Sequence, residues 1–166
     1  MTFTRRHWLA ATAAAACLPH AQAQAGSLKI SHQFPSGTLT EGEIILDRHV
    51  DISGADSEDV LRCVYLNSYF EAGIRSPLDD AVLKHDPPGI AGFRKLDEIP
   101  FDFQRKRLSV VVRRGETHTL VTKGEVESVM TQCPRVWADG VAQAFDDVRR
   151  AQAEATFHEL SAQGFR

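Results

Sequence analysis

Apolar and polar residues alternate in several short segments of the chain. This two-residue period is typical of strands, whose side chains point to opposite faces. The pattern predicts strands at residues 27–34, 43–53, 93–101, 107–113 and 117–122. Because the last two segments are separated only by Arg114, Gly115 and Glu116, a turn of hairpin length, we expect them to pair in antiparallel fashion.

Other segments show the three-to-four-residue spacing of a helix. Ser57, followed by two acidic residues, predicts an N-cap, and apolar residues then recur at helical spacing up to Leu66. Ser76 followed by Pro77 predicts a second helix, because proline is favoured at the first helical position. A short helix is expected at residues 124–133. Helices beside antiparallel strands predict an α+β fold, in which an antiparallel sheet is flanked by helices.

The longest predicted element is a helix over residues 141–163. Its expected buried face is a stripe of apolar residues at helical spacing. The stripe consists of Val141, Ala144, Phe145, Val148, Ala151, Ala155 and Leu160.

The first 25 residues are typical of an export leader. Arg5 and Arg6 precede an alanine-rich apolar run, and Ala23 and Ala25 form a cleavage site before Gly26. The arginine pair resembles that of a twin-arginine leader. A buried amphipathic helix is an alternative, but the alanines show no apolar face. We therefore expect residues 1–25 to be a signal peptide that directs export to the periplasm.

Composition and charge limit the possible functions. With 166 residues, of which 43% are apolar, the chain is long enough for one domain with one core. Its net charge of −3 argues against a general nucleic-acid or anionic-membrane binder, and no apolar run is long enough to span a bilayer. The 3 cysteines and 7 histidines show no metal-ligand spacing. We expect no nucleic-acid partner, no transmembrane segment and no dedicated metal site.

Two segments resemble a known family. Residues 97–112 have the sequence DEIPFDFQRKRLSVVV and residues 120–124 have the sequence LVTKG. Together they resemble the nucleotide-binding (N) domain of P-type ATPases, most closely the bacterial magnesium-transporting branch. Further pieces follow the family's order: SGTLT at 36–40, DISG at 51–54, LNS at 66–68 and QGFR at 163–166. The resemblance covers residues 36–166 and implies an N-domain-like sheet that is truncated at its C-terminus.

The resemblance also implies a site for ATP, bound as Mg-ATP. Phe101 would stack on adenine, and Lys123 would close the far side of the slot. Gly124 would allow close backbone approach and open the next helix, whose N–H groups would favour an anion. Asp79 would reach the adenine amino group, and Arg166 would pair with the phosphates. The family motifs imply these roles; the spacing of the residues does not.

Several of these residues also have simpler interpretations. Phe101 shares a strand face with Ile99 and Phe103, so it could belong to the core. Lys123 could be an exposed surface lysine, and Asp79 could stabilise a helix N-terminus. The sequence leaves these interpretations open beside the functional ones.

The family's catalytic centre is not matched. P-type ATPases form an aspartyl phosphate on the Asp of the motif D-K-T-G-T-L-T. The corresponding positions are Phe34 and Pro35, and phenylalanine is not a nucleophile. The T-G-D and G-D-G-x-N-D segments of the family are also missing from the sequence. We expect no catalytic residue, no autophosphorylation and no ion transport.

The start of the expected mature chain points to another family. Residues 27–35 (SLKISHQFP) resemble the first strand of TRAP-type periplasmic solute receptors, so we expect residues 26–35 to be a receptor-like strand before a partial N domain. The leader predicts export, whereas the family's N domain lies on the cytoplasmic side of the inner membrane. Three interpretations stay open: an ATP-binding fragment of a magnesium pump, an exported solute- or partner-binding protein, and a non-functional fusion product.

Overall fold

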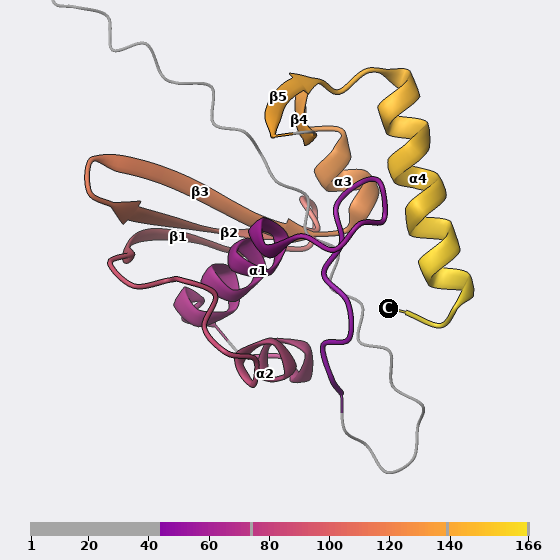
Figure 1. Ribbon diagram of the computed structural model, residues 1–166. Helices are drawn as coiled ribbons and strands as arrows, with labels where there is room; N and C mark the ends of the chain where they lie inside the picture. The colour runs from indigo at the N-terminus through magenta and orange to yellow at the C-terminus, as the bar shows by residue number, and fades with distance from the viewer. Residues whose placement is uncertain (1–43, 74, 139, 166) are drawn as a thin grey trace, which may run out of the picture.

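The computed structural model describes residues 44–73, 75–138 and 140–165 of the chain, and its elements form two groups along the sequence (Figure 1). The first group contains α1 (Glu58–Phe70), α2 (Pro77–Leu83), β1 (Arg94–Asp102), β2 (Arg107–Arg114) and β3 (Thr117–Gly124). The second contains α3 (Val126–Met130), β4 (Arg135–Ala138), β5 (Val141–Ala144) and α4 (Asp147–Ala162). Among the described helices, none is both long and apolar enough to cross a membrane.

Strands β1, β2 and β3 form an antiparallel sheet in that order, which confirms the three strands predicted from alternation. The predicted hairpin joins β2 and β3, and Gly115 in its turn has a positive φ of 58°. At one end of the sheet, Asp102 lies opposite Arg107, which lies opposite Gly124. This row brings the end of β1 close to the end of β3.

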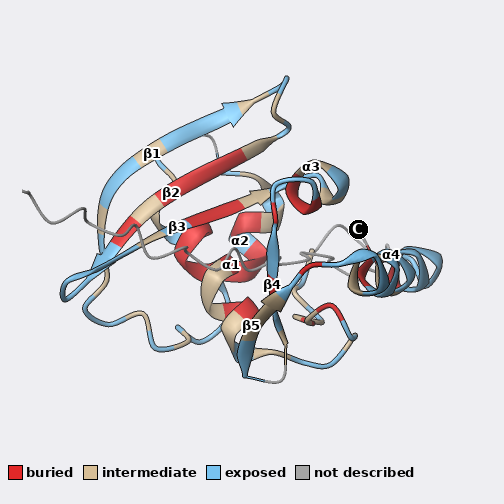
Figure 2. Cartoon of the chain, turned by 90° about the horizontal axis from the view of Figure 1, so that it is seen from above, coloured by how far each residue is buried: buried red, intermediate tan, exposed pale blue. Residues whose placement is uncertain are grey.

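Helices α1 and α2 lie on one face of this sheet (Figure 1). Both predicted N-caps are present, since the side chains of Ser57 and Ser76 accept from N–H groups in the first helical turn. Asn67 ties α1 to the sheet, because its side-chain amide donates to the Val121 carbonyl oxygen at 3.0 Å. Buried apolar residues fill the space between helix and sheet: Leu66, Val110, Val112 and Val121. Figure 2 shows this burial in α1 and the middle of β2, whereas β1 is largely exposed.

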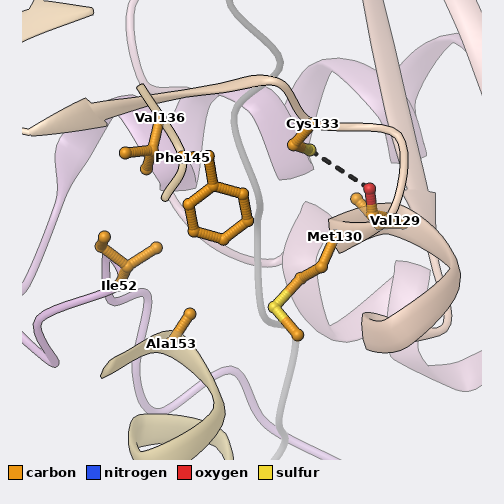
Figure 3. Close-up of a cluster of buried hydrophobic side chains, with 7 residues drawn as sticks. All are labelled: Ile52, Val129, Met130, Cys133, Val136, Phe145 and Ala153. Atoms are coloured by element: carbon orange, nitrogen blue, oxygen red, sulfur yellow. Dashed lines mark hydrogen bonds between the residues drawn. The ribbon is translucent and has the colours of Figure 1, made fainter. Parts of the chain in front are cut away.

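A second core joins α3, the β4–β5 hairpin and α4. Figure 3 shows its side chains pointing toward one another: Ile52, Val129, Met130, Cys133, Val136, Phe145 and Ala153. The Cys133 thiol donates to the Val129 carbonyl oxygen at 3.2 Å, and burial raises the pKa of this thiol to about 11. The thiol therefore stays protonated and unreactive inside the core.

The predicted helix over residues 141–163 is wrong at its start. Val141–Ala144 form strand β5, which pairs in antiparallel fashion with β4. The helix begins only after Asp146, whose side chain accepts from the Arg149 N–H at 3.0 Å as an N-cap. The short apolar segment before the cap fits either period, so the pattern alone did not separate strand from helix.

The buried face of α4 also differs from the predicted stripe. Val148 is 77% exposed, and Ala151 and Ala155 are exposed as well. The residues of α4 that are buried are Ala153 and Leu160. Residues 141–145 set the phase of the predicted stripe, and because they precede the helix, the stripe pointed to the wrong face.

The strand predicted at residues 43–53 is not formed within the described residues. A single antiparallel bridge joins Val50 and Asp56 instead. Asp51 lies between them, and its carboxylate accepts from the Ser53 N–H at 2.8 Å. Such a local side-chain turn competes with strand pairing for the same backbone groups.

Other predictions concern residues outside the described part of the chain. They include the leader at 1–25, the receptor-like strand at 26–35, and the positions of Phe34 and Pro35. These stay predictions.

The packing of α4 predicts different effects for two nearby alanines. Ala153 is fully buried, so Ala153→Leu should overfill the second core and lower the free energy of unfolding by about 1–3 kcal/mol. Ala155 is exposed, so Ala155→Leu should change it by less than about 0.5 kcal/mol. Urea unfolding of both variants measures the two changes. Equal effects would contradict the orientation of α4.

Candidate functional site

Lys123, near the end of β3, lies at the centre of a small cluster of charges. Its Nζ donates to Glu71 Oε2 at 2.7 Å and to Asp79 Oδ1. Glu71 is the C-cap of α1 and Asp79 lies in the first turn of α2, so the ammonium group joins both helices to the sheet. The lysine side chain is only 17% exposed. The interpretation of Lys123 as an exposed surface residue is therefore wrong.

Asp79 is deeply buried, with 2% of the residue exposed. Its Oδ1 accepts from Ser68 Oγ at 2.7 Å and from Lys123. Its Oδ2 accepts from the Ser76 hydroxyl at 2.7 Å and from the Ser76 N–H at 3.1 Å. Burial alone would raise the pKa of Asp79, but the hydrogen bonds from its three partners outweigh burial and lower the pKa to about 2. The carboxylate is thus ionised at neutral pH.

The local sequence explains why Asp79 lies there. Ser76 is the N-cap of α2, Pro77 is the first helical residue and Asp79 is the third, which is the spacing of a capping box. Ser76 Oγ accepts from the Asp79 N–H at 3.3 Å, and the Asp79 carboxylate accepts from Ser76 in return. The interpretation that Asp79 stabilises a helix N-terminus is confirmed, and its contact with Lys123 is an addition to that role.

The segment after α1 crosses the sheet from β3 to β1. Glu71 contacts Lys123 on β3, and the next residue, Ala72, donates its N–H to Glu98 Oε2 on β1 at 3.1 Å. Phe101 follows three residues further along β1, toward the end of the sheet. At roughly 4.8 Å per strand, β1 and β3 are about 10 Å apart at this end.

Phe101 is not a core residue. Its side chain is 49% exposed, and its ring meets the ring of Phe103 edge to face with centroids 5.2 Å apart. The core interpretation assumed regular alternation through Ile99, but the register shifts between Ile99 and Asp102. An exposed ring at the end of β1 can therefore meet a ligand.

Gly124 permits a close approach of the turn between β1 and β2. A Cβ at this position would lie 2.5 Å from the Lys106 carbonyl oxygen and 2.7 Å from Arg107 Cα. Both distances are far inside van der Waals contact, so a larger residue would push this turn away from β3. The glycine thus keeps the backbone next to Lys123 in place.

The helix after Gly124 does not provide the expected anion site. Helix α3 has five residues, and its N-cap Glu125 makes no side-chain capping hydrogen bond. Glu127 lies in the first turn, and the Glu125 carboxylate pairs with Lys106 at 2.6 Å. Two carboxylates at the start of a short helix oppose the binding of a phosphate there.

The structure brings Lys123, Gly124 and Asp79 together and places Phe101 at the same end of the sheet, on the other edge strand. Arg166 lies outside the described residues, so its contact with phosphates stays a prediction.

Two residues of the cluster, Glu71 and Ser68, were not predicted from the sequence. Ser68 is fully buried in α1, next to the equally buried Asn67. Because buried polar groups need partners, this polar pair inside an apolar helical stripe is a signal that indicates a polar contact. Glu71 carries no such signal, since a glutamate after a helix is usually on the surface.

Two pockets lie elsewhere on the described part of the chain. One, of about 240 Å³, lies between α1 and β3 and is lined by apolar residues such as Leu66 and Phe93. The other, of about 370 Å³, lies beside α4 and includes Asp51 and Arg149. Neither includes Lys123. No group of three or more His, Cys, Asp or Glu side chains within the described ranges is arranged to hold a metal ion.

Comparison with known proteins shows which family this arrangement is similar to. Residues 89–166, which include all the elements from β1 to α4, match the family model of the P-type ATPase cytoplasmic domain N. The fold is P-type ATPase N-domain-like. This finding confirms the predicted fold class, an antiparallel sheet with flanking helices, and supports the N-domain resemblance of the segment.

The N-domain-like chain is also similar to two kinds of transport ATPase. It is 38% identical over 147 residues to the P-type 1 magnesium-transporting ATPases of Salmonella typhimurium and Escherichia coli. That alignment covers 85% of this chain but 16% of each relative, so the chain spans a small part of their length. It is 32% identical over 77 residues to a calcium-transporting ATPase of Bacillus subtilis, which covers 46% of this chain and 9% of that protein.

The lowered pKa of Asp79 predicts a pH-dependent contribution to stability. An acid with a depressed folded-state pKa stabilises the fold above its ordinary pKa of 3.8, and this contribution is lost as the pH falls through about 2. Asp79→Asn keeps the shape but removes the charge, so it should lower the free energy of unfolding by about 2 kcal/mol at neutral pH. This difference from the wild type should shrink as the pH falls from about 4 to about 2.

Urea unfolding across this pH range measures the effect. Asp80→Asn is the matched control, because Asp80 is the exposed neighbour of Asp79 on α2. A difference for Asp79→Asn that stays constant with pH would show that the charge of Asp79 does not stabilise the fold.

Proposed function

We propose that this chain is an adenine-nucleotide-binding module related to the N domain of magnesium-transporting P-type ATPases. The N-domain-like fold supports the proposal, as do the matched relatives, which are ATPases by name. Because ATP is the substrate of an ATPase, ATP is the proposed ligand. Magnesium enters as the ion of Mg-ATP, held by the phosphates and not by a dedicated protein site.

The observation that carries this proposal is the position of Lys123 relative to Phe101. Two carboxylates hold the ammonium group near the end of β3, and an exposed aromatic ring stands at the same end on β1. A flat aromatic ligand gains by stacking on such a ring, and the aliphatic stem of a lysine can cover its other side. These two walls suit an adenine ring.

The other residues of the proposed site support these walls. Gly124 keeps the backbone beside Lys123 in place, and Asp79 holds the ammonium group. Arg166 pairs with the phosphates. Because α3 starts with carboxylates, the phosphates extend away from its N-terminus.

The proposed activity is binding of ATP without phosphoryl transfer. Phe34 and Pro35 occupy the positions at which the family has its phosphorylated Asp and the following Lys. The phenylalanine ring has no group that can accept a phosphoryl group. The chain would therefore bind ATP but form no aspartyl phosphate and transport no ion.

An NMR titration of the full chain with Mg-ATP tests the proposal. Amide shifts should cluster around Phe101 and Lys123. Phe101→Ala should weaken binding roughly tenfold to a hundredfold, since stacking a base on an aromatic ring contributes about 1–3 kcal/mol. Leu120→Ala is the matched control, because Leu120 lies in the same sheet and has nearly the same exposure, 48%. This variant should bind as the wild type does.

Two results would contradict the proposal. The first is a well-dispersed spectrum that does not change with millimolar Mg-ATP. The second is binding that Phe101→Ala leaves unaltered, or that both substitutions weaken equally while the fold stays intact.

A further inference from the structure

The two carboxylates beside Lys123 differ in their capacity to accept a further hydrogen bond. An ionised carboxylate has about four lone-pair sites, and the four hydrogen bonds to Asp79 fill them. Glu71 accepts one hydrogen bond, from Lys123 to Oε2. Within the described part of the chain, Glu71 Oε1 accepts none. A ligand donor would therefore find an acceptor at Glu71 and not at Asp79.

Glu71 is also held firmly in position. It is the C-cap of α1, and its backbone N–H donates to the Asn67 carbonyl oxygen at 3.0 Å. The next residue, Ala72, is bonded to Glu98 on β1. The Glu71 side chain is only 10% exposed, so water competes little with a ligand for its free oxygen.

The local charge favours a ligand group that donates a hydrogen bond. One ammonium and two carboxylates sum to a charge of −1, and the C-terminal end of α1 adds partial negative charge. Lys123 has three N–H donors, of which two are used by the carboxylates. The cluster therefore suits a ligand edge with an N–H donor beside an acceptor, and it opposes a phosphate.

We propose that Glu71 is the residue that recognises the 6-amino group of the bound adenine. Its Oε1 accepts a hydrogen bond from this amino group, while the third N–H of Lys123 donates to the neighbouring ring nitrogen. Asp79 acts as a positioning residue that fixes the ammonium group. This inference rests on the proposed function, because it assigns a contact within the same nucleotide site.

The test compares ATP with the triphosphate of purine riboside, which lacks only the 6-amino group. The wild-type full chain should bind ATP about tenfold more tightly, the effect expected of one hydrogen bond to a charged acceptor. Glu71→Met keeps the length of the side chain but removes both acceptor oxygens, so the preference should fall below about twofold. Glu71→Gln, which keeps one neutral acceptor, should retain an intermediate preference. Asp80→Asn, a control with the same change of charge, should keep the full preference.

Each outcome separates this inference from the proposed function. If the wild type binds ATP but shows no preference over the analogue, or if both Glu71 variants keep the full preference, Glu71 does not read the amino group. If Asp79→Asn removes the preference and Glu71→Gln does not, Asp79 is the acceptor and the assignment is wrong. If the folded wild type binds neither nucleotide, the proposed function itself fails.

Discussion

The buried ammonium group of Lys123 is the constraint on which the arrangement of α1, α2 and the sheet depends. A cation at this depth without partners would cost several kcal/mol, so the chain must bring carboxylates to it. Glu71 and Asp79 reach it from the end of α1 and the start of α2. The segment between the two helices is thereby tied to β3, and through Ala72 it is also tied to β1.

Local sequence and site chemistry meet in a single side chain. Asp79 closes the capping box of α2 and holds Lys123 at the same time, so the signal Ser76-Pro77 that starts the helix also fixes the lysine. A carboxylate with all its lone pairs occupied is a rigid anchor but a poor acceptor for a ligand. This division of tasks leaves recognition to Glu71, whose backbone is fixed and whose side chain has one free oxygen.

Elements with a cap or a turn of their own could be predicted from the sequence. Ser57 and Ser76 mark the starts of α1 and α2, and the turn at Gly115 marks the β2–β3 hairpin. Residues 141–145 lack such a signal. A segment this short fits the period of a strand as well as that of a helix, and pairing with β4 decides between them. An error in the start of a helix also shifts its predicted buried face, which is why Ala153 was missed.

The sequence by itself determined the fold class, the order of most elements and, through family motifs, the candidates Phe101, Lys123 and Gly124. Only the tertiary structure decided which side chains meet. Lys123 is 44 residues from Asp79 and 52 from Glu71 along the chain, and no periodicity encodes such distances. The structure likewise decided that Asp79 is saturated and that Phe101 is exposed. Both depend on how close other backbone segments come, and only packing fixes that closeness.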